Sequence, residues 1–180
     1  AFLLSPATLG AVRRFQRTLR QRNAGLAGHA SERELDAWDD QLSAAAAGLL
    51  LRRQHAVRAL TEAFEEAYQL LRGSAFPALA LGYRAEPWLN EPQTQAEVEE
   101  SYRKRYNEGR VRDRHAGHTQ EGPHRHDLCI VAGDRPAREV LSSGQVKVVA
   151  AALRLATVIH VERERGEPLP VMVDDVDAEL

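Results

Sequence analysis

The feature that most constrains the fold is a long helical pattern over residues 31–72. It begins at Ser31-Glu32-Arg33-Glu34, a capping box in which the serine and glutamate side chains satisfy backbone N–H groups of the first turn. Gly73-Ser74 ends it. An unbroken helix of this length extends about 60 Å. Its apolar seam consists of Leu35, Trp38, Leu42, Leu49, Val57, Leu60, Phe64 and Leu71. The pattern predicts an arm, and nothing in it points to catalysis.

A second helical pattern precedes this arm. Ser5-Pro6 is typical of a helix start, with serine as N-cap and proline at the first helical position. Gly25 and Gly28 indicate its end. The short loop that follows predicts an antiparallel helical hairpin, and Gly48 is expected to let another helix approach closely. The expected apolar stripe consists of Leu9, Val12, Phe15 and Leu19.

Basic residues lie between the positions of that stripe, namely Arg13, Arg14, Arg17 and Arg20. A solvated face is the simplest interpretation, and a face for DNA phosphates is the alternative. The formal net charge of −2 gives no global signal for nucleic acid, so any such binding would need a local patch.

Composition sets further bounds. With 180 residues, 43% of them hydrophobic, the chain can form one domain or two small ones around a real core. A single cysteine, Cys129, excludes a disulfide framework and fits a reducing compartment such as the cytoplasm. No uninterrupted apolar run approaches the roughly 18 residues of a membrane span. The sequence shows no signal peptide and no initiator Met, so we expect a piece of a longer protein.

The middle of the chain alternates strand and helix patterns. We expect a strand over 76–84, a surface helix over 95–112, and a strand over 127–132 followed by a turn at Gly133-Asp134. Four histidines fall within twelve residues, His115, His118, His124 and His126. A zinc site is conceivable, but their spacing matches no known finger or zincin pattern.

The strongest functional signal is Leu141-Ser142-Ser143-Gly144-Gln145, directly before a helix expected over 143–165. A loop that opens a helix presents backbone N–H groups and a positive dipole end, which suits a phosphate. After Gly166, an apolar strand over 171–173 leads into Asp174-Asp175, an acid pair suited to Mg²⁺ and an attacking water. The simpler alternatives are a helix N-cap and a strand-end turn. A GxxxxGK[ST] loop is absent from the sequence, so the site would be incomplete.

Several segments, in this order and with these gaps, resemble the RecF family of bacterial recombination-repair ATPases in the ABC/SMC-like class. They are Arg20-Gln21-Arg22-Asn23, Leu35-Asp36-Ala37-Trp38-Asp39-Asp40-Gln41-Leu42, Gly122-Pro123-His124-Arg125, Leu141 to Lys147, Ala152 to Ala156, Asp174-Asp175 and Glu179-Leu180. The resemblance implies an α/β (α+β) fold, with 1–73 as an inserted helical arm and 74–180 as part of an ABC-type ATPase head. It places the phosphate-binding loop upstream of this chain, so the chain alone is expected to be inactive.

The resemblance also implies site residues. Ser142, Ser143, Gly144 and Gln145 would form the signature that meets the γ-phosphate of ATP bound by a second copy. Asp174 would hold Mg²⁺ through water, and Asp175 would act as the catalytic carboxylate. His124, Arg125 and Glu179 would lie near the site. His126 and Asp177 depart from the family pattern.

The function implied is ATP-dependent dimerisation and binding of single-/double-stranded DNA junctions. Its partners would be RecR and RecO, in loading RecA and in the SOS response, within DNA replication, repair and recombination. The alternatives are a non-catalytic helical module that binds a protein partner and another SMC-like ATPase head.

Overall fold

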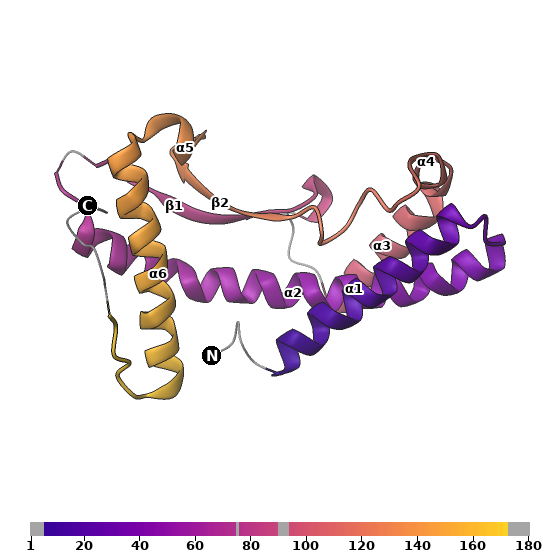
Figure 1. Cartoon of the computed structure of the whole chain (residues 1–180), viewed down its shortest axis with the longest axis horizontal. Helices are drawn as coiled ribbons and strands as arrows, with labels where there is room; N and C mark the ends of the chain where they lie inside the picture. The colour runs from indigo at the N-terminus through magenta and orange to yellow at the C-terminus, as the bar shows by residue number, and fades with distance from the viewer. Residues whose placement is uncertain (1–5, 75, 90–93, 173–180) are drawn as a thin grey trace. The chain divides into compact units, whose positions relative to one another are not determined.

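In a computed structural model, residues 6–74, 76–89 and 94–172 are described (Figure 1). The elements are, in order, α1 (Pro6–Ala27), α2 (Glu32–Leu71), β1 (Ala80–Arg84), the 3₁₀ helix η2 (Pro87–Leu89), α3 (Gln95–Glu108), α4 (Arg110–Ala116), β2 (Asp127–Ala132), β3 (Arg135–Pro136), α5 (Ala137–Val140) and α6 (Ser143–Arg165).

The chain forms two compact units. The helical unit comprises Leu4–Gln54 and Arg84–Asp127, and the sheet unit comprises Ala1–Leu3, His55–Tyr83 and Leu128–Leu180. The long helix α2 contributes residues to both. The expected division into an arm over 1–73 and a head over 74–180 follows the lobes of the family and remains a prediction.

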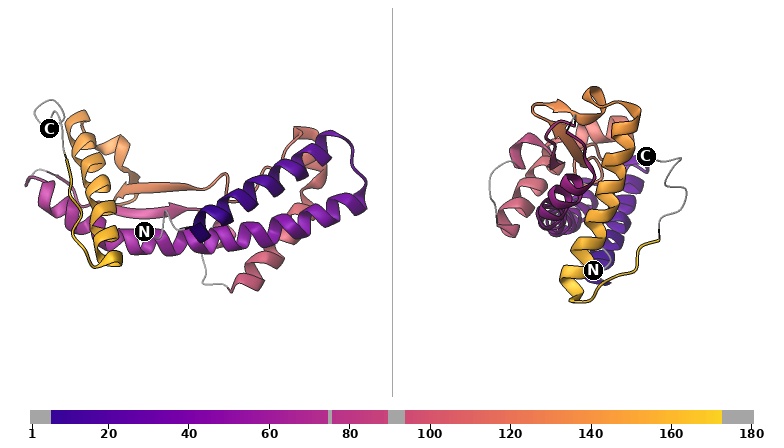
Figure 2. Two further views of the ribbon diagram at one scale, coloured as in Figure 1. Left: turned by 60° about the horizontal axis from the view of Figure 1, so that its bottom comes forward. Right: turned by 90° about the vertical axis from the view of Figure 1, so that its left-hand side faces the viewer.

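In the helical unit, α1 runs back along the first part of α2 as the expected antiparallel hairpin (Figures 1 and 2). The capping box at the start of α2 forms as predicted, since the Ser31 N–H donates to Glu34 Oε2 at 2.8 Å. Gly25 lies at the closed end of the hairpin. A Cβ there would meet the Ala30 Cβ at 3.3 Å and Leu35 Cδ2 at 3.5 Å, so the small residue permits the close turn.

The buried face of α1 differs from the predicted apolar stripe. Leu9 is 44% exposed, whereas the buried positions are Ala11, Phe15, Thr18, Arg22 and Leu26. This face is buried instead because the Arg22 guanidinium is fully hydrogen-bonded inside the unit, as described below. The prediction that another helix approaches closely at Gly48 is also wrong, because a Cβ there would meet nothing within 4 Å.

The helix predicted over 95–112 is two helices. The break falls at Gly109, which ends α3 and begins α4 and whose N–H donates to the Arg105 carbonyl at 2.8 Å. Glycine is a poor residue for a helix interior, which favours a break at this position. A capping box with Thr94 and Glu97 starts α3.

The described residues form a three-stranded sheet in the order β1-β2-β3, most of which lies in the sheet unit. Strands β2 and β3 pair antiparallel, with Val131 opposite Pro136, and Gly133 turns between them at φ 64°. The predicted strand over 127–132 and the helix over 143–165 are confirmed, whereas only 80–84 of the strand expected over 76–84 forms. Helix α6 ends at Gly166, which adopts φ 69°. The core consists of Leu60, Ala63, Phe64, Ala67, Tyr68, Leu81, Val149, Ala152 and Ala156.

The buried strand expected over 171–173 is not seen where the structure describes it. Val171 is 51% exposed and Met172 fully exposed, and both lie outside any strand. A strand needs a neighbour to satisfy its backbone N–H and C=O groups, and the described sheet has no strand paired with these residues. Val173, Asp174, Asp175, Asp177 and Glu179 lie outside the described residues.

By length and composition, α6 is the one helix among the described residues that could cross a membrane. The sequence argument from uninterrupted apolar runs did not reveal this. Val149, Ala152 and Ala156 of this helix are buried in the core of the sheet unit, and a core helix passes the same test.

Candidate functional site

The predicted signature forms the start of α6. Ser142 is the N-cap: its Oγ accepts from the Gln145 N–H at 3.3 Å, and its own N–H donates to Gln145 Oε1 at 2.9 Å. Ser142, Ser143 and Gly144 are exposed, and a Cβ at Gly144 would meet nothing within 4 Å. The turn is therefore a helix N-cap, as the simpler interpretation holds. It also presents the positive end of α6 to solvent, an arrangement that suits a phosphate.

The other predicted site residues are distributed as follows. Asp174, Asp175 and Glu179 lie outside the described residues, so their approach to the Ser142 turn remains a prediction. His124 and Arg125 belong to the helical unit, whereas Ser142 to Gln145 belong to the sheet unit. Within the described residues, no group of three or more His, Cys, Asp or Glu side chains is placed to hold a metal ion. The four clustered histidines therefore do not form such a group.

The Gly122-Pro123-His124-Arg125 segment is a packed turn of the helical unit. His124 Nε2 lies 3.0 Å from the Thr119 carbonyl oxygen, and its ring centroid lies 6.0 Å from that of Phe15. Desolvation lowers the pKa of His124. Gly122 has φ 127°, and a Cβ there would meet the Tyr106 hydroxyl at 2.8 Å, so a larger residue would be strained. These contacts give the segment a structural role.

Glu86 lies in the segment after β1 and connects it to that turn. Its carboxylate accepts from the Gly122 N–H at 2.7 Å and pairs with His126 Nε2. Burial acts to raise the pKa of Glu86, but the His126 and backbone contacts outweigh it and hold that pKa below its ordinary value of 4.5. His126, which departs from the family pattern, is thus a partner of a partly buried carboxylate.

We expect Glu86→Ala to lower the free energy of unfolding by about 1–3 kcal/mol at pH 7, because it leaves buried polar groups without their acceptor. Because the folded-state pKa of Glu86 lies below its unfolded value, the carboxylate stabilises the fold above pH 4.5 and this contribution is lost as pH falls through the folded-state pKa. Urea unfolding of both proteins between pH 7 and pH 3 should therefore show the difference shrinking. A difference that is constant with pH would contradict this assignment, and Glu108→Ala at the surface serves as the control.

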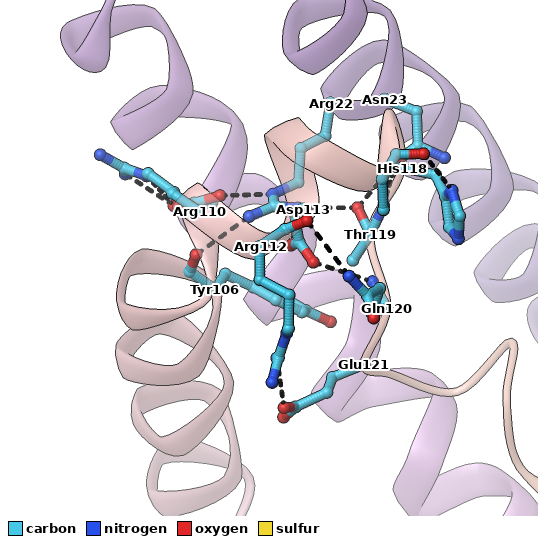
Figure 3. Close-up of polar contacts among 12 residues, drawn as sticks. Arg22, Asn23, Tyr106, Arg110, Arg112, Asp113, His118, Thr119, Gln120 and Glu121 are labelled. Atoms are coloured by element: carbon cyan, nitrogen blue, oxygen red, sulfur yellow. Dashed lines mark hydrogen bonds and ion pairs between the residues drawn. The ribbon is translucent and has the colours of Figure 1, made fainter.

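The most extensive polar cluster of the helical unit surrounds Arg22 (Figure 3). This side chain is fully buried. Its Nε donates to Asp39 Oδ1 at 2.6 Å, and its Nη1 donates to Asp113 Oδ2 at 2.7 Å and to Thr119 Oγ1 at 2.8 Å. Its Nη2 donates to the Tyr106 carbonyl at 3.0 Å. One guanidinium thus joins α1 to α2, α3, α4 and the loop that carries Thr119.

Arg110 belongs to the same polar cluster, which we call the arginine network. Its Nη2 donates to Asp39 Oδ2 at 2.6 Å and to Asp36 Oδ1 at 2.6 Å, and its Nη1 donates to Glu32 Oε2 at 2.9 Å. Desolvation opposes its charge, but the carboxylates outweigh it and raise the pKa of Arg110. The buried members, Arg22, Arg110, Asp39 and Asp113, carry two positive and two negative charges. Such a balance offsets the desolvation that a lone buried ion would suffer.

Sequence analysis did not single out this network, although Arg22, Asp36 and Asp39 lie in segments that carry the family resemblance. A signal was present: Arg22 follows Phe15 by seven residues and Thr18 by four, in register with the buried face of α1. A basic residue in an apolar register requires a carboxylate partner. Which carboxylates it finds, 17 and 91 residues away, is a matter of tertiary structure.

No family model matches the chain. Among curated proteins, a "DNA replication and repair protein RecF" of Anaeromyxobacter dehalogenans (strain 2CP-C) is 34% identical over 180 residues, covering 100% of this chain and 48% of the relative. One of the same description from Stenotrophomonas maltophilia (strain R551-3) is 36% identical, covering 99% and 47%. The chain is similar to these RecF proteins over its whole length. It spans about half the length of the RecF relatives it matches.

Solved structures agree on the fold. The recombination mediator protein RecF-ATP in the RecFOR pathway superimposes with a TM-score of 0.86 at 23% identity, covering 99% of this chain and 48% of that one. The RecF-ATPrS structure gives the same TM-score. The α/β (α+β) fold class expected from sequence is confirmed, since the chain shares the fold of the RecF structures.

Proposed function

We propose that this chain is part of an ATP-dependent DNA-repair ATPase of RecF type, which clamps two copies together around ATP. The observation that carries the proposal is the exposed Ser142 turn at the start of α6, in a chain with the fold of RecF structures determined with ATP. A helix N-terminus free of covering side chains suits a phosphate brought by a second molecule.

Within this proposal, Ser142, Ser143, Gly144 and Gln145 donate to the γ-phosphate held by the partner copy. Asp174 holds Mg²⁺ through water, and the ion when bound supplies charge against the phosphate oxygens. Asp175 orients the attacking water. Because the sequence has no GxxxxGK[ST] loop, we expect chain 1–180 alone not to hydrolyse ATP.

The dimer formed with ATP would bind junctions of single- and double-stranded DNA in the cytoplasm. RecO and RecR would be its protein partners in loading RecA, with the SOS response as the outcome. Hydrolysis would open the dimer and release the DNA. The similarity to these relatives supports these assignments, since they are described as DNA replication and repair proteins.

The test is ATP-driven dimerisation of the full-length protein. We expect Ser142→Arg to weaken the ATP-dependent dimer about tenfold or more, because a long cation replaces the small hydroxyl that faces the γ-phosphate. ATP binding by the monomer should be unchanged. Light scattering with and without ATP measures the first and fluorescent-nucleotide titration the second.

Arg138→Gln, in the short helix α5 just before the turn, serves as the exposed control. Dimerisation of Ser142→Arg at the level of the parent protein would exclude the signature role for this turn. A parent protein that stays monomeric in ATP would exclude the proposed function itself.

A further inference from the structure

Three arginines form a row on the outer face of α1. Arg13, Arg17 and Arg20 are spaced i, i+4 and i+7, so they lie on one side of the helix, and all three are exposed. The buried residues Phe15, Thr18 and Arg22 lie about half a turn away around the helix axis. We call Arg13, Arg17 and Arg20 the arginine stripe. It is about 10 Å long at 1.5 Å per residue.

The charge of the stripe is not neutralised. The sequence of α1 contains no Asp or Glu, and within the described residues none of the three side chains forms an ion pair. Like charges at this spacing destabilise a helix by about 0.2–0.5 kcal/mol per pair. The basic residues of α3 and α4 differ, since Arg103 pairs with Asp40 at 3.7 Å, Lys104 with Glu108 at 3.9 Å and Arg112 with Glu121 at 2.8 Å. In a chain of net charge −2, the stripe is thus a local positive patch.

A groove of the helical unit carries two more arginines. It has a volume of about 530 Å³ and is lined by residues of α1 and α2, with Gln95. Arg14 and Arg52 are among its lining residues, and Ala11, Ala44, Ala45 and Gly48 are the small ones. Gly48 faces open space here instead of another helix. Two further cations therefore border a recess on the α2 side of α1, which Leu51 and Gln41 also line.

We propose that the arginine stripe binds the phosphate backbone of duplex DNA. A duplex carries about one negative charge per 1.7 Å of axis, so a 10 Å row lies along roughly six phosphates. Single strands are held chiefly by aromatic stacking, and the exposed face of α1 carries no aromatic residue. The surface reads charge and shape, without base contacts, and so binds without sequence preference.

This inference rests on the proposed DNA function and assigns it a surface. The experiment uses the full-length protein with ATP and a fluorescent duplex, titrated at several salt concentrations. The stripe variant is Arg13→Gln/Arg17→Gln/Arg20→Gln. We expect the slope of log affinity against log salt to fall by about 2–3, and affinity at 0.1 M salt to fall about tenfold or more. ATP-driven dimerisation should be unchanged, because these side chains have no partner within the described residues.

The matched control is Arg103→Gln/Lys104→Gln/Arg112→Gln, which removes the same charge from α3 and α4 of the same unit. An equal loss of affinity in both variants would overturn the assignment, since net charge alone would explain it. Unchanged duplex binding by the stripe variant, with dimerisation intact, would overturn the inference and leave the proposed function standing. Binding of polyglutamate, a model for an acidic protein partner, is measured alongside. If the stripe variant loses polyglutamate binding but keeps duplex binding, the surface serves an acidic protein and the inference is overturned. A parent protein that binds no DNA in ATP would overturn both.

Discussion

Arg22→Met is expected to lower the opening free energy of the helical unit by about 3–5 kcal/mol. Methionine can fill much of the volume, but it leaves Asp39 and Asp113 buried with one cation fewer than before. Both carboxylates are almost inaccessible, at 2% and 3% exposure, so water cannot replace the lost donors. The Thr119 hydroxyl and the Tyr106 carbonyl lose a partner at the same time.

Native-state hydrogen exchange on α1, α2 and α4 measures this opening free energy directly in the full-length protein. Arg20→Met is the matched control, because it lies on the same helix and removes the same charge from an exposed position. It should change stability by about 0.5 kcal/mol or less. A loss below 1 kcal/mol in Arg22→Met would show that the network does not hold the unit together.

A second-site variant sharpens the interpretation. Adding Asp113→Asn to Arg22→Met removes one of the two stranded charges, so the double variant should be less destabilised than the sum of the single ones. Additive losses would mean that Arg22 and Asp113 act independently, against the 2.7 Å contact between them.

Asp175→Asn is expected to lower the ATP turnover of the full-length protein by about 10²–10⁴-fold, the usual contribution of a positioned general base. The amide fills the same space but cannot take a proton from the attacking water. Dimerisation in ATP should persist, because the clamp depends on bound ATP and hydrolysis opens it. Single-turnover hydrolysis and light scattering on one sample measure both properties.

Asp177→Asn is the control, two residues along the same acidic segment, and should change turnover less than about twofold, because no part in the chemistry is assigned to it. Asp174→Asn should instead raise the Mg²⁺ concentration needed for hydrolysis, as expected for a residue that holds the ion. Turnover of Asp175→Asn equal to that of the parent protein would remove Asp175 from the catalytic role.

What the sequence could predict was local. Helix α6 and strand β2 begin and end where their patterns indicate, and the capping boxes at Ser31 and Ser142 form as the spacing of donor and acceptor residues requires. The glycine at 166 adopts the left-handed conformation that ends a helix. Each of these features depends on groups within one helical turn, so neighbouring residues suffice to specify it.

Burial and pairing were decided by tertiary structure. The buried face of α1 differs from the predicted stripe because Arg22 pairs with carboxylates that lie 17 and 91 residues away in the sequence. No local sequence pattern indicates pairs so far apart. Val171 and Met172 were expected in a buried strand but are exposed, because an apolar run becomes a strand only where a neighbouring strand pairs with it. The sequence by itself determined where α1, α2 and α6 start and stop, because caps and glycines act within one helical turn. Which charges lie inside depended on partners that only the folded chain brings together.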